Sequence, residues 1–460
     1  MKKILFFICL LWSIASSAQI GNQIWYFGQG AGIDFSSSTP TPLSNGVLNS
    51  LDCSSALTDD NGQLIMYTNG QMVYNKNHAL MLNGSGLNGS NNGGQAALIV
   101  PQPFSNLCYI FSVDQFAGSQ GFNYHIVDLT LDNGNGEVIS KNNLLFSPST
   151  ERIDAIYNSQ DSSFWIITHS WNTNDYLCYK LTPAGLNIIP VVSSIGSIHQ
   201  GGLTGVYNSM GQLTFSKDGS KVACGIYSLG QVEIFDFDMQ TGLLSNPIAI
   251  NNIPNTWGVA FSKEATKLYL TSWFSKNIYQ VDLSSGNQFI MQSTLTNIGT
   301  VDGPGFSGYY SGYLQLAPND IIYIASFGDT YLGQITYPED LGVACGLVDN
   351  GFYLGGSTCN AGLCRTVNMP EKVLLSINTI DHKSPFIIST ISNGQFEIEI
   401  RNNDKYSSCK LFDISGRLLK TVYSENNIFK LECEVSGVYM IIANSENGRQ
   451  LADKIFFGNE

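Results

Sequence analysis

The feature that most constrains the fold is a loosely repeated unit of two strands joined by a tight polar turn. The clearest copies cover residues 213–223, 259–269 and 314–323, and weaker copies cover residues 56–74, 96–129 and 153–181. A third strand follows each clear copy, at residues 231–237, 277–283 and 333–337. A period of roughly 40 to 50 residues built from such units is typical of propeller blades. A ring is expected because one four-stranded blade cannot bury both of its faces alone.

The copies predict an all-β protein whose main domain, residues 19–376, is a seven-bladed β-propeller. Six units are legible, and the strand at residues 24–27 is expected to complete a further blade with the last segment before the linker. Charged residues make up only 13% of the chain, whereas 46 glycines and 12% aromatic residues are present. This composition favours a turn-rich all-β fold.

Both ends of the chain carry further signals. Residues 386–457 alternate apolar and polar side chains between short turns, which predicts a small immunoglobulin-like β-sandwich at residues 386–460 after a linker at 377–385. At the other end, two lysines precede an apolar stretch and the small residues Ser16, Ser17 and Ala18. Residues 1–18 therefore read as a signal peptide, which is too short to span a bilayer. No later segment is long and apolar enough to be a transmembrane segment.

The C-terminal motifs resemble a known sorting domain. The sequence Leu-Phe-Asp-Ile-Ser-Gly-Arg at 411–417, Ser-Gly-Val-Tyr at 436–439 and Lys-Ile at 454–455 is similar to the type A sorting domain of type IX secretion substrates. The Pro-Asn-Pro turn that usually opens that domain is reduced here to Ser-Pro-Phe at 384–386. The resemblance places Gly416, Gly437, Tyr439 and Lys454 in the sorting signature. It implies recognition by the type IX secretion machinery and delivery through the periplasm to the outer-membrane cell surface or the medium.

The main domain carries a second resemblance. Its motifs include Ile-Trp-Tyr-Phe-Gly at 24–28, Leu-Ile-Met-Tyr-Thr-Asn-Gly at 64–70, Trp-Ile-Ile-Thr-His at 165–169 and Val-Glu-Ile-Phe-Asp-Phe-Asp at 232–238. In this order they resemble the propeller-like region of surface proteins associated with gliding motility. That family implies no defined activity.

The charge balance narrows the classes of partner. The formal net charge is −14, and no run of lysine and arginine occurs. Nucleic acid is therefore excluded as an expected partner, because phosphate binding needs a basic surface. An extracellular glycan or protein remains as the expected ligand.

Catalytic motifs are missing from the sequence. It contains no nucleophile elbow, phosphate-binding loop or His-Glu-x-x-His motif. We therefore expect a protein that is not an enzyme, with no catalytic residues, no metal ligands and no cofactor. The segment Asp132–Glu137 has the alternating oxygen ligands that calcium favours, although a solvated hairpin loop is the preferred interpretation.

Aromatic and histidine residues in presumed loops supply the candidate ligand-binding positions. They are Trp171, His169, His199, Trp273, Tyr309 and Tyr310. Flat rings beside amide and hydroxyl groups suit carbohydrate or protein recognition. The alternative is that the histidines are structural and that half of the aromatic side chains pack blades together.

Nine cysteines remain once Cys9 is removed with the signal peptide. An exported protein favours disulfides, and we expect one loop-stapling disulfide where Cys359 and Cys364 lie close together in a glycine-rich loop with Cys345 upstream. Cys409 and Cys433 form a second candidate pair, and the pairing itself stays open. A further three, Cys108, Cys178 and Cys224, lie in apolar strand contexts and are expected to be buried thiols.

These observations favour an exported, non-enzymatic adhesion propeller on the cell surface. Two alternatives stay open, namely a secreted propeller enzyme that acts on glycans and a structural component of the gliding or envelope apparatus.

Overall fold

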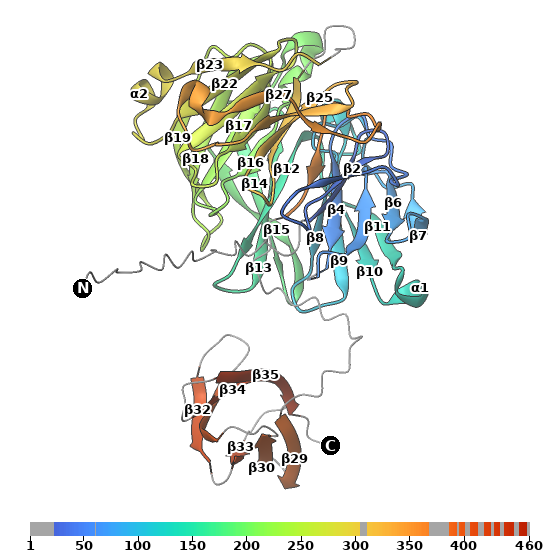
Figure 1. The fold of residues 1–460 in the computed structure, drawn as a ribbon, viewed down its shortest axis with the longest axis vertical. Helices are drawn as coiled ribbons and strands as arrows, with labels where there is room; N and C mark the ends of the chain where they lie inside the picture. Colours follow the sequence, from blue (N-terminus) through green and yellow to red (C-terminus); the bar gives the residue numbers. More distant parts are fainter. Residues whose placement is uncertain are drawn as a thin grey trace, which may run out of the picture. The chain divides into compact units, whose positions relative to one another are not determined.

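A computed structural model describes residues 23–59, 61–303, 311–367, 386–392, 395–400, 405–412, 418–424, 427–432, 437–445 and 450–457. The chain divides into two compact units, Met1–Ile377 and Asn378–Glu460. Strands dominate both units (Figure 1). None of the helices in this described part has the length and apolarity that a bilayer crossing requires.

The first unit is a propeller-like series of small antiparallel sheets. One sheet contains β1 (Ile24–Phe27), β2 (Ala31–Asp34) and β3 (Thr41–Leu43). The next contains β4 (Ser54–Thr58), β5 (Leu64–Thr68), β6 (Met72–Asn75), β7 (Leu80–Ser85), β8 (Ala97–Pro101), β9 (Leu107–Val113), β10 (Phe122–Asp128) and β11 (Glu137–Phe146), with β28 (Cys364–Arg365) at its edge. Within it, β7 and β11 share a single parallel pair, Glu137 with Leu82.

Four four-stranded sheets follow in chain order. They are β12 (Ser149–Asn158), β13 (Ser163–Ser170), β14 (Asp175–Thr182) and β15 (Gly185–Ser194); β16 (Leu213–Phe215), β17 (Lys221–Ile226), β18 (Gln231–Phe237) and β19 (Leu244–Ile250); β20 (Thr256–Phe261), β21 (Lys267–Ser272), β22 (Asn277–Asp282) and β23 (Thr296–Thr300); and β24 (Ser311–Leu316), β25 (Ile322–Ser326), β26 (Tyr331–Ile335) and β27 (Leu347–Tyr353). The three clear sequence repeats therefore form the first two strands of the last three sheets.

Short helices connect some of these strands. They are α1 (Leu131–Gly134), α2 (Gln288–Ser293) and the 3-10 turns η1 (Gln115–Ala117), η2 (Leu203–Gly205), η3 (Tyr207–Ser209) and η4 (Gly342–Cys345).

Apolar clusters lie between successive sheets and continue from the last sheet back to the first. Tyr323 and Ala325 of β25 pack with Trp25 of β1 in one fully buried cluster. In Figure 1 the blue strands at the start of this unit lie beside its orange strands. This continuous core is the physical basis of ring closure, because each sheet needs a neighbour on both faces.

The closing contact differs from the sequence-based expectation. We expected residues 24–27 to share a blade with the last segment; β1 pairs with β2, and the last segment meets this sheet through a single bridge between Gln29 and Thr358. β28 runs parallel to β4 and pairs Cys364 with Ser54. The Ser55 hydroxyl also donates to the Arg365 carbonyl at 2.8 Å. The two ends of the first unit are thus joined at the innermost strand of the second sheet.

The second unit contains two small antiparallel sheets. One holds β29 (Phe386–Ser392), β30 (Gln395–Ile400) and β33 (Ile428–Glu432); the other holds β32 (Leu418–Tyr423), β31 (Tyr406–Phe412), β34 (Gly437–Ser445) and β35 (Gln450–Phe457). Buried Ile398 and Phe429 from one sheet share a cluster with Leu411 and Ile441 from the other.

Candidate active site

Two cavities lie at opposite ends of the inner strands of the first unit. On β12, Glu151 lines one cavity and Asp154 lines the other. On β20, Trp257 lines the first, whereas Phe261 lines the second. Because a strand rises about 3.3 Å per residue, the two sets of lining groups on each strand lie roughly 10 Å apart.

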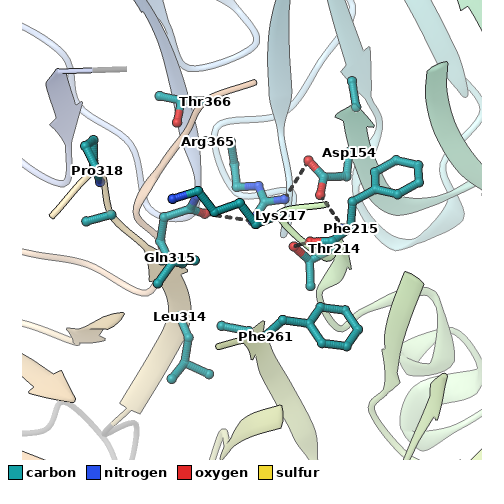
Figure 2. Close-up of a pocket in the computed structure, with 14 residues that line it drawn as sticks. Asp154, Thr214, Phe215, Lys217, Phe261, Leu314, Gln315, Pro318, Arg365 and Thr366 are labelled. Atoms are coloured by element: carbon teal, nitrogen blue, oxygen red, sulfur yellow. Dashed lines mark hydrogen bonds and ion pairs between the residues drawn. The ribbon is translucent and has the colours of Figure 1, made fainter. Parts of the chain in front are cut away.

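The second cavity is small and internally paired (Figure 2). Its volume is about 50 Å³. Arg365 forms an ion pair with Asp154 at 2.8 Å and donates to the Gln315 side chain at 2.8 Å. At its rim, Lys217 pairs with Asp320 at 2.9 Å. Each of these charges has an opposite partner, although Arg365 Nε is buried without a hydrogen-bond partner among the described residues. We call the Arg365–Asp154 ion pair the clasp.

The first cavity is larger, with a volume of about 230 Å³, and is lined mainly by aromatic side chains. We call it the aromatic cavity. Its lining comprises Leu51, Asp52, Asn92, Phe116, Glu151, Tyr207, Met210, Tyr227, Trp257, Trp273, Phe274, Phe327 and Ala361. Buried Asp52 and Glu151 are its two acidic groups.

Irregular pairing at the start of three inner strands aims side chains toward this end. The register shifts between Ser149 and Ile153 on β12, between Thr256 and Val259 on β20, and between Ser311 and Leu314 on β24. Such bulges redirect side chains near functional sites. The residues inside the three shifts include Glu151, Trp257 and Tyr313.

Glu151 is held by two backbone donors. The Gly94 amide donates to Oε2 at 2.7 Å, and the Phe116 amide donates to Oε1 at 2.6 Å. Phe116 has a φ of 53°, in the left-handed region, and this backbone conformation directs its amide at the carboxylate. Burial raises the pKa of Glu151, while the two amides and the guanidinium of Arg152 oppose the shift.

Asp52 has the less favourable environment for a charge. Burial raises its pKa well above the ordinary value, and the nearby Glu151 raises it further. Its Oδ1 atom is buried and has no hydrogen-bond partner among the described residues. Two neighbouring carboxyl groups whose environments separate their pKa values are suited to acid and base roles. Burial favours the protonated form of both groups, and the amides of Gly94 and Phe116 give Glu151 a stabilisation of its charged form that Asp52 lacks.

The aromatic rings form a continuous wall. The Trp257 ring lies 4.4 Å from the Trp273 ring and 5.0 Å from the Tyr313 ring, measured between centroids. The wall continues through Tyr227 to Tyr207, whose ring stacks on the Phe116 ring with centroids 5.9 Å apart. Within the described part of the chain, Trp257 Nε1 and Tyr313 Oη are also buried without a hydrogen-bond partner. Unpaired polar atoms beside a cavity indicate groups available to a ligand.

The structure distributes the predicted ligand-binding residues over separate places. Trp273 lines the aromatic cavity. Trp171 is 8% exposed, and His169 and His199 are fully buried; none of these three lines either cavity. Their role in binding stays a prediction, and Tyr309 and Tyr310 lie outside the described residues.

The two buried histidines stack on each other, with ring centroids 3.6 Å apart. Burial lowers the pKa of both rings well below the ordinary value. The His199 Nε2 atom lies 3.8 Å from Glu233 Oε2. Among the described residues, no three His, Cys, Asp or Glu side chains are grouped to hold a metal ion.

The sorting-signature residues fall in the second unit. Gly437 and Tyr439 lie on β34, where they pair with Phe457 and Ile455 of β35, and Lys454 pairs with Met440. Gly416 lies outside the described residues.

One disulfide prediction is wrong. Cys359 and Cys364 are buried free thiols, as is Cys409. Cys364 belongs to β28, whereas Cys359 lies in the preceding loop, and their backbones are held by different partners. Cys433, the expected partner of Cys409, is not among the described residues. The prediction of buried thiols at Cys108, Cys178 and Cys224 is confirmed.

Sequence reasoning missed both acidic residues of the aromatic cavity. Asp52 precedes β4 in no recognisable motif, and its proximity to Glu151 arises only from ring packing. A signal was present at Glu151, because adjacent Glu151 and Arg152 interrupt a strand in a chain with few charges. Arg152 is fully buried and donates to the carbonyls of Asn208, Ser209, Met210 and Gly225.

No protein-family model and no curated protein matches this sequence. Several solved structures resemble it over most of its length. A protein of Bacteroides fragilis, proposed to be a 6-phosphogluconolactonase, is 12% identical with a TM-score of 0.42, and the match covers 80% of this chain and 94% of that one. The periplasmic gluconolactonase of Pseudomonas aeruginosa is 12% identical with a TM-score of 0.38, covering 79% and 95%. The dihydro-heme d1 dehydrogenase NirN is 11% identical with a TM-score of 0.41, covering 91% and 75%.

These structures and the aromatic cavity correct one prediction. We expected a protein that is not an enzyme because the sequence lacks a catalytic motif. Structures named as lactonases and as a dehydrogenase recur among the similar ones, and the cavity holds an acidic pair suited to proton transfer. This finding withdraws the expectation that the protein is not an enzyme, and none of these similarities assigns an activity or a substrate to this chain.

Proposed function

We propose that the first unit is a propeller enzyme that cleaves a glycan in the aromatic cavity by acid–base chemistry. The observation that carries the proposal is the buried, unpartnered Oδ1 of Asp52 beside Glu151. A carboxyl group that stays protonated near neutral pH is a proton donor, and a neighbouring carboxylate is a proton acceptor.

Each acidic residue has one role in the proposed reaction. Asp52 donates its proton to the leaving oxygen as the glycosidic C–O bond breaks. Glu151 accepts a proton from the water molecule whose oxygen forms the new bond to that carbon. The amides of Gly94 and Phe116 keep the Glu151 carboxylate in place during this exchange.

The walls of the cavity favour a sugar as the group bound. Aromatic faces stack on the C–H faces of sugar rings, while carboxyl and amide groups take the hydroxyls. The volume of about 230 Å³ is below the roughly 300–1,000 Å³ of drug-sized pockets, so one sugar ring is a suitable occupant. A phosphorylated sugar is disfavoured, because the described lining contains no Lys, Arg or His.

The test is glycan cleavage by the purified protein, followed as the release of new reducing ends from a panel of polysaccharides. The substitutions Asp52→Asn and Glu151→Gln are each expected to lower kcat by about 10²-fold or more. Glu137→Gln is the matched control, because Glu137 lies on β11, lines neither cavity and accepts a hydrogen bond from the Asn83 side chain at 2.8 Å. Cleavage that survives both cavity substitutions would overturn the proposal.

We further propose that the propeller of the first unit has seven blades. The nine-stranded sheet divides at the single Glu137–Leu82 pair into β4–β7 and β8–β11, which supports two blades there. With the β1–β3 sheet and the four later sheets, the ring would contain seven. An experimental structure of the first unit tests this number.

Export of the enzyme is the other part of the proposal. The N-terminal 18 residues act as a signal peptide, and the second unit acts as an immunoglobulin-like sorting domain that the type IX machinery recognises. The motif sequences and the antiparallel β34–β35 pair support this role. Removing β35 is expected to trap the protein in the periplasm, and normal export of a chain ending at Ile377 would contradict it.

A further inference from the structure

The aromatic cavity has an unbalanced charge environment. Asp52 and Glu151 line it, and no Lys, Arg or His does so among the described residues. Buried Arg152 acts electrostatically on Glu151, but its guanidinium hydrogens are directed at the carbonyls of Asn208, Ser209 and Gly225. Asp114 adds a further acidic influence on Glu151. With Asp52 protonated as proposed, the Glu151 carboxylate is the negative charge of the cavity, and no lining side chain among the described residues carries the opposite charge.

The aromatic walls of the cavity are also suited to a positively charged ligand. Tyr207, Tyr227, Trp257, Trp273 and Phe116 present π systems around the two carboxyl groups. The faces of aromatic rings attract cations, and the attraction reaches about 2 kcal/mol or more where water is excluded. A neutral sugar would use only the apolar part of this wall.

The unpartnered Asp52 Oδ1 atom is a free hydrogen-bond acceptor at this cavity. A buried polar atom without a partner costs roughly 1–3 kcal/mol, and an ammonium group carries three donors that can reach such an acceptor.

From these three observations we infer that the substrate carries a protonated amine and that the aromatic cavity selects amino sugars over neutral sugars. This inference rests on the proposed function and names the substrate class of that site. In this proposal the amine donates to Asp52 Oδ1 and to the Glu151 carboxylate, against the aromatic rings that line the cavity. A bound positive charge also favours release of the Asp52 proton, so the correct substrate makes its own acid more effective.

The inference is tested by binding to the full chain, measured by calorimetry with glucosamine, glucose, N-acetylglucosamine and tetramethylammonium as probes. Glucosamine is expected to bind about tenfold or more tightly than glucose and N-acetylglucosamine, and tetramethylammonium is expected to compete with it. Glu151→Gln should remove this preference, whereas the control Glu137→Gln should keep it. Equal binding of the three sugars, or the absence of cation binding, would overturn the inference.

The same experiments separate the two proposals. If the protein cleaves neutral glycans and shows no preference for amines, the proposed function stands and the amine inference is overturned. Amine binding by a protein that cleaves no glycan would support the cation site and overturn the enzymatic role.

Discussion

Glu151 and Asp154 lie three residues apart on β12, yet Glu151 lines the aromatic cavity and Asp154 lines the small cavity. Asp154 is neutralised by Arg365 at 2.8 Å, whereas Glu151 receives only backbone amides and faces an aromatic cavity. One strand thus supplies a structural ion pair at one end and a reactive carboxyl group at the other.

The first prediction concerns the stability of Asp52→Asn. Burial raises the pKa of Asp52, so the folded chain keeps this proton at pH values where the unfolded chain, with a pKa of about 4, has lost it. The wild-type free energy of unfolding therefore falls as pH rises from about 4 through the raised pKa. Asp52→Asn cannot ionise and should be more stable than the wild type by about 1–3 kcal/mol at pH 8.

Urea unfolding at pH 4.5 and pH 8 checks this, with the difference expected to shrink at the lower pH. Asp238→Asn is the control, because Asp238 is exposed and local hydrogen bonds lower its pKa. A variant less stable than the wild type at pH 8 would show that Asp52 is ionised in the folded protein.

The second prediction concerns the clasp at the small cavity. Arg365→Met leaves Asp154 buried without its cation, and removal of one partner of a buried pair costs about 3–5 kcal/mol. Asp154→Leu combined with Arg365→Met should cost clearly less than the sum of the single changes. A double-mutant cycle by urea unfolding measures the coupling, and additive losses would mean that the pair contributes nothing to closure.

Much of the fold follows from the sequence, because strand periodicity and turn chemistry are local signals. The three clear repeats became β16–β17, β20–β21 and β24–β25 as expected. The pairing of β28 with β4 was not predicted, since it joins residues more than 300 positions apart and involves only Cys364 and Arg365 of the last segment. No periodic pattern marks a two-residue strand.

The candidate site was harder to predict for a related reason. Trp273 was identified from its aromatic character. Asp52 and Glu151, which line the same cavity, come from segments about 100 residues apart and were not identified. The bulges that aim Glu151 and Trp257 leave little trace in composition. His169 and His199 attracted attention as rare residue types, although the structure buries them away from both cavities.

The third prediction follows from the cysteines. Eight described cysteines are buried free thiols, and burial raises the pKa of Cys359 and Cys364 to about 12. Because the thiolate is the reactive form, both should resist maleimide in the native protein and react after unfolding. Mass spectrometry of labelled peptides measures each site. A disulfide between them, or fast native labelling, would contradict the structure.

The fourth prediction uses Gly94, whose amide holds Glu151. A Cβ atom at this position would lie 2.2 Å from Tyr313 Oη and 3.3 Å from Glu151 Oε2. Since the Tyr313 ring packs on Trp257 and cannot yield freely, Gly94→Ala should shift the amide, cost about 1–3 kcal/mol of stability and weaken glucosamine binding. Gly93→Ala is the matched control, because its Cβ would meet nothing closer than the Ser90 carbonyl at 3.3 Å.

Urea unfolding and calorimetry on both variants separate the two effects. Gly94→Ala should lose stability and binding together, while Gly93→Ala should change both only slightly. Unchanged glucosamine affinity in a destabilised Gly94→Ala protein would show that the position of the Glu151 carboxylate does not govern amine recognition. Tyr313→Phe removes the hydroxyl nearest the new methyl group. If glucosamine affinity is restored in the double variant Gly94→Ala with Tyr313→Phe, the loss of binding in Gly94→Ala comes from that contact.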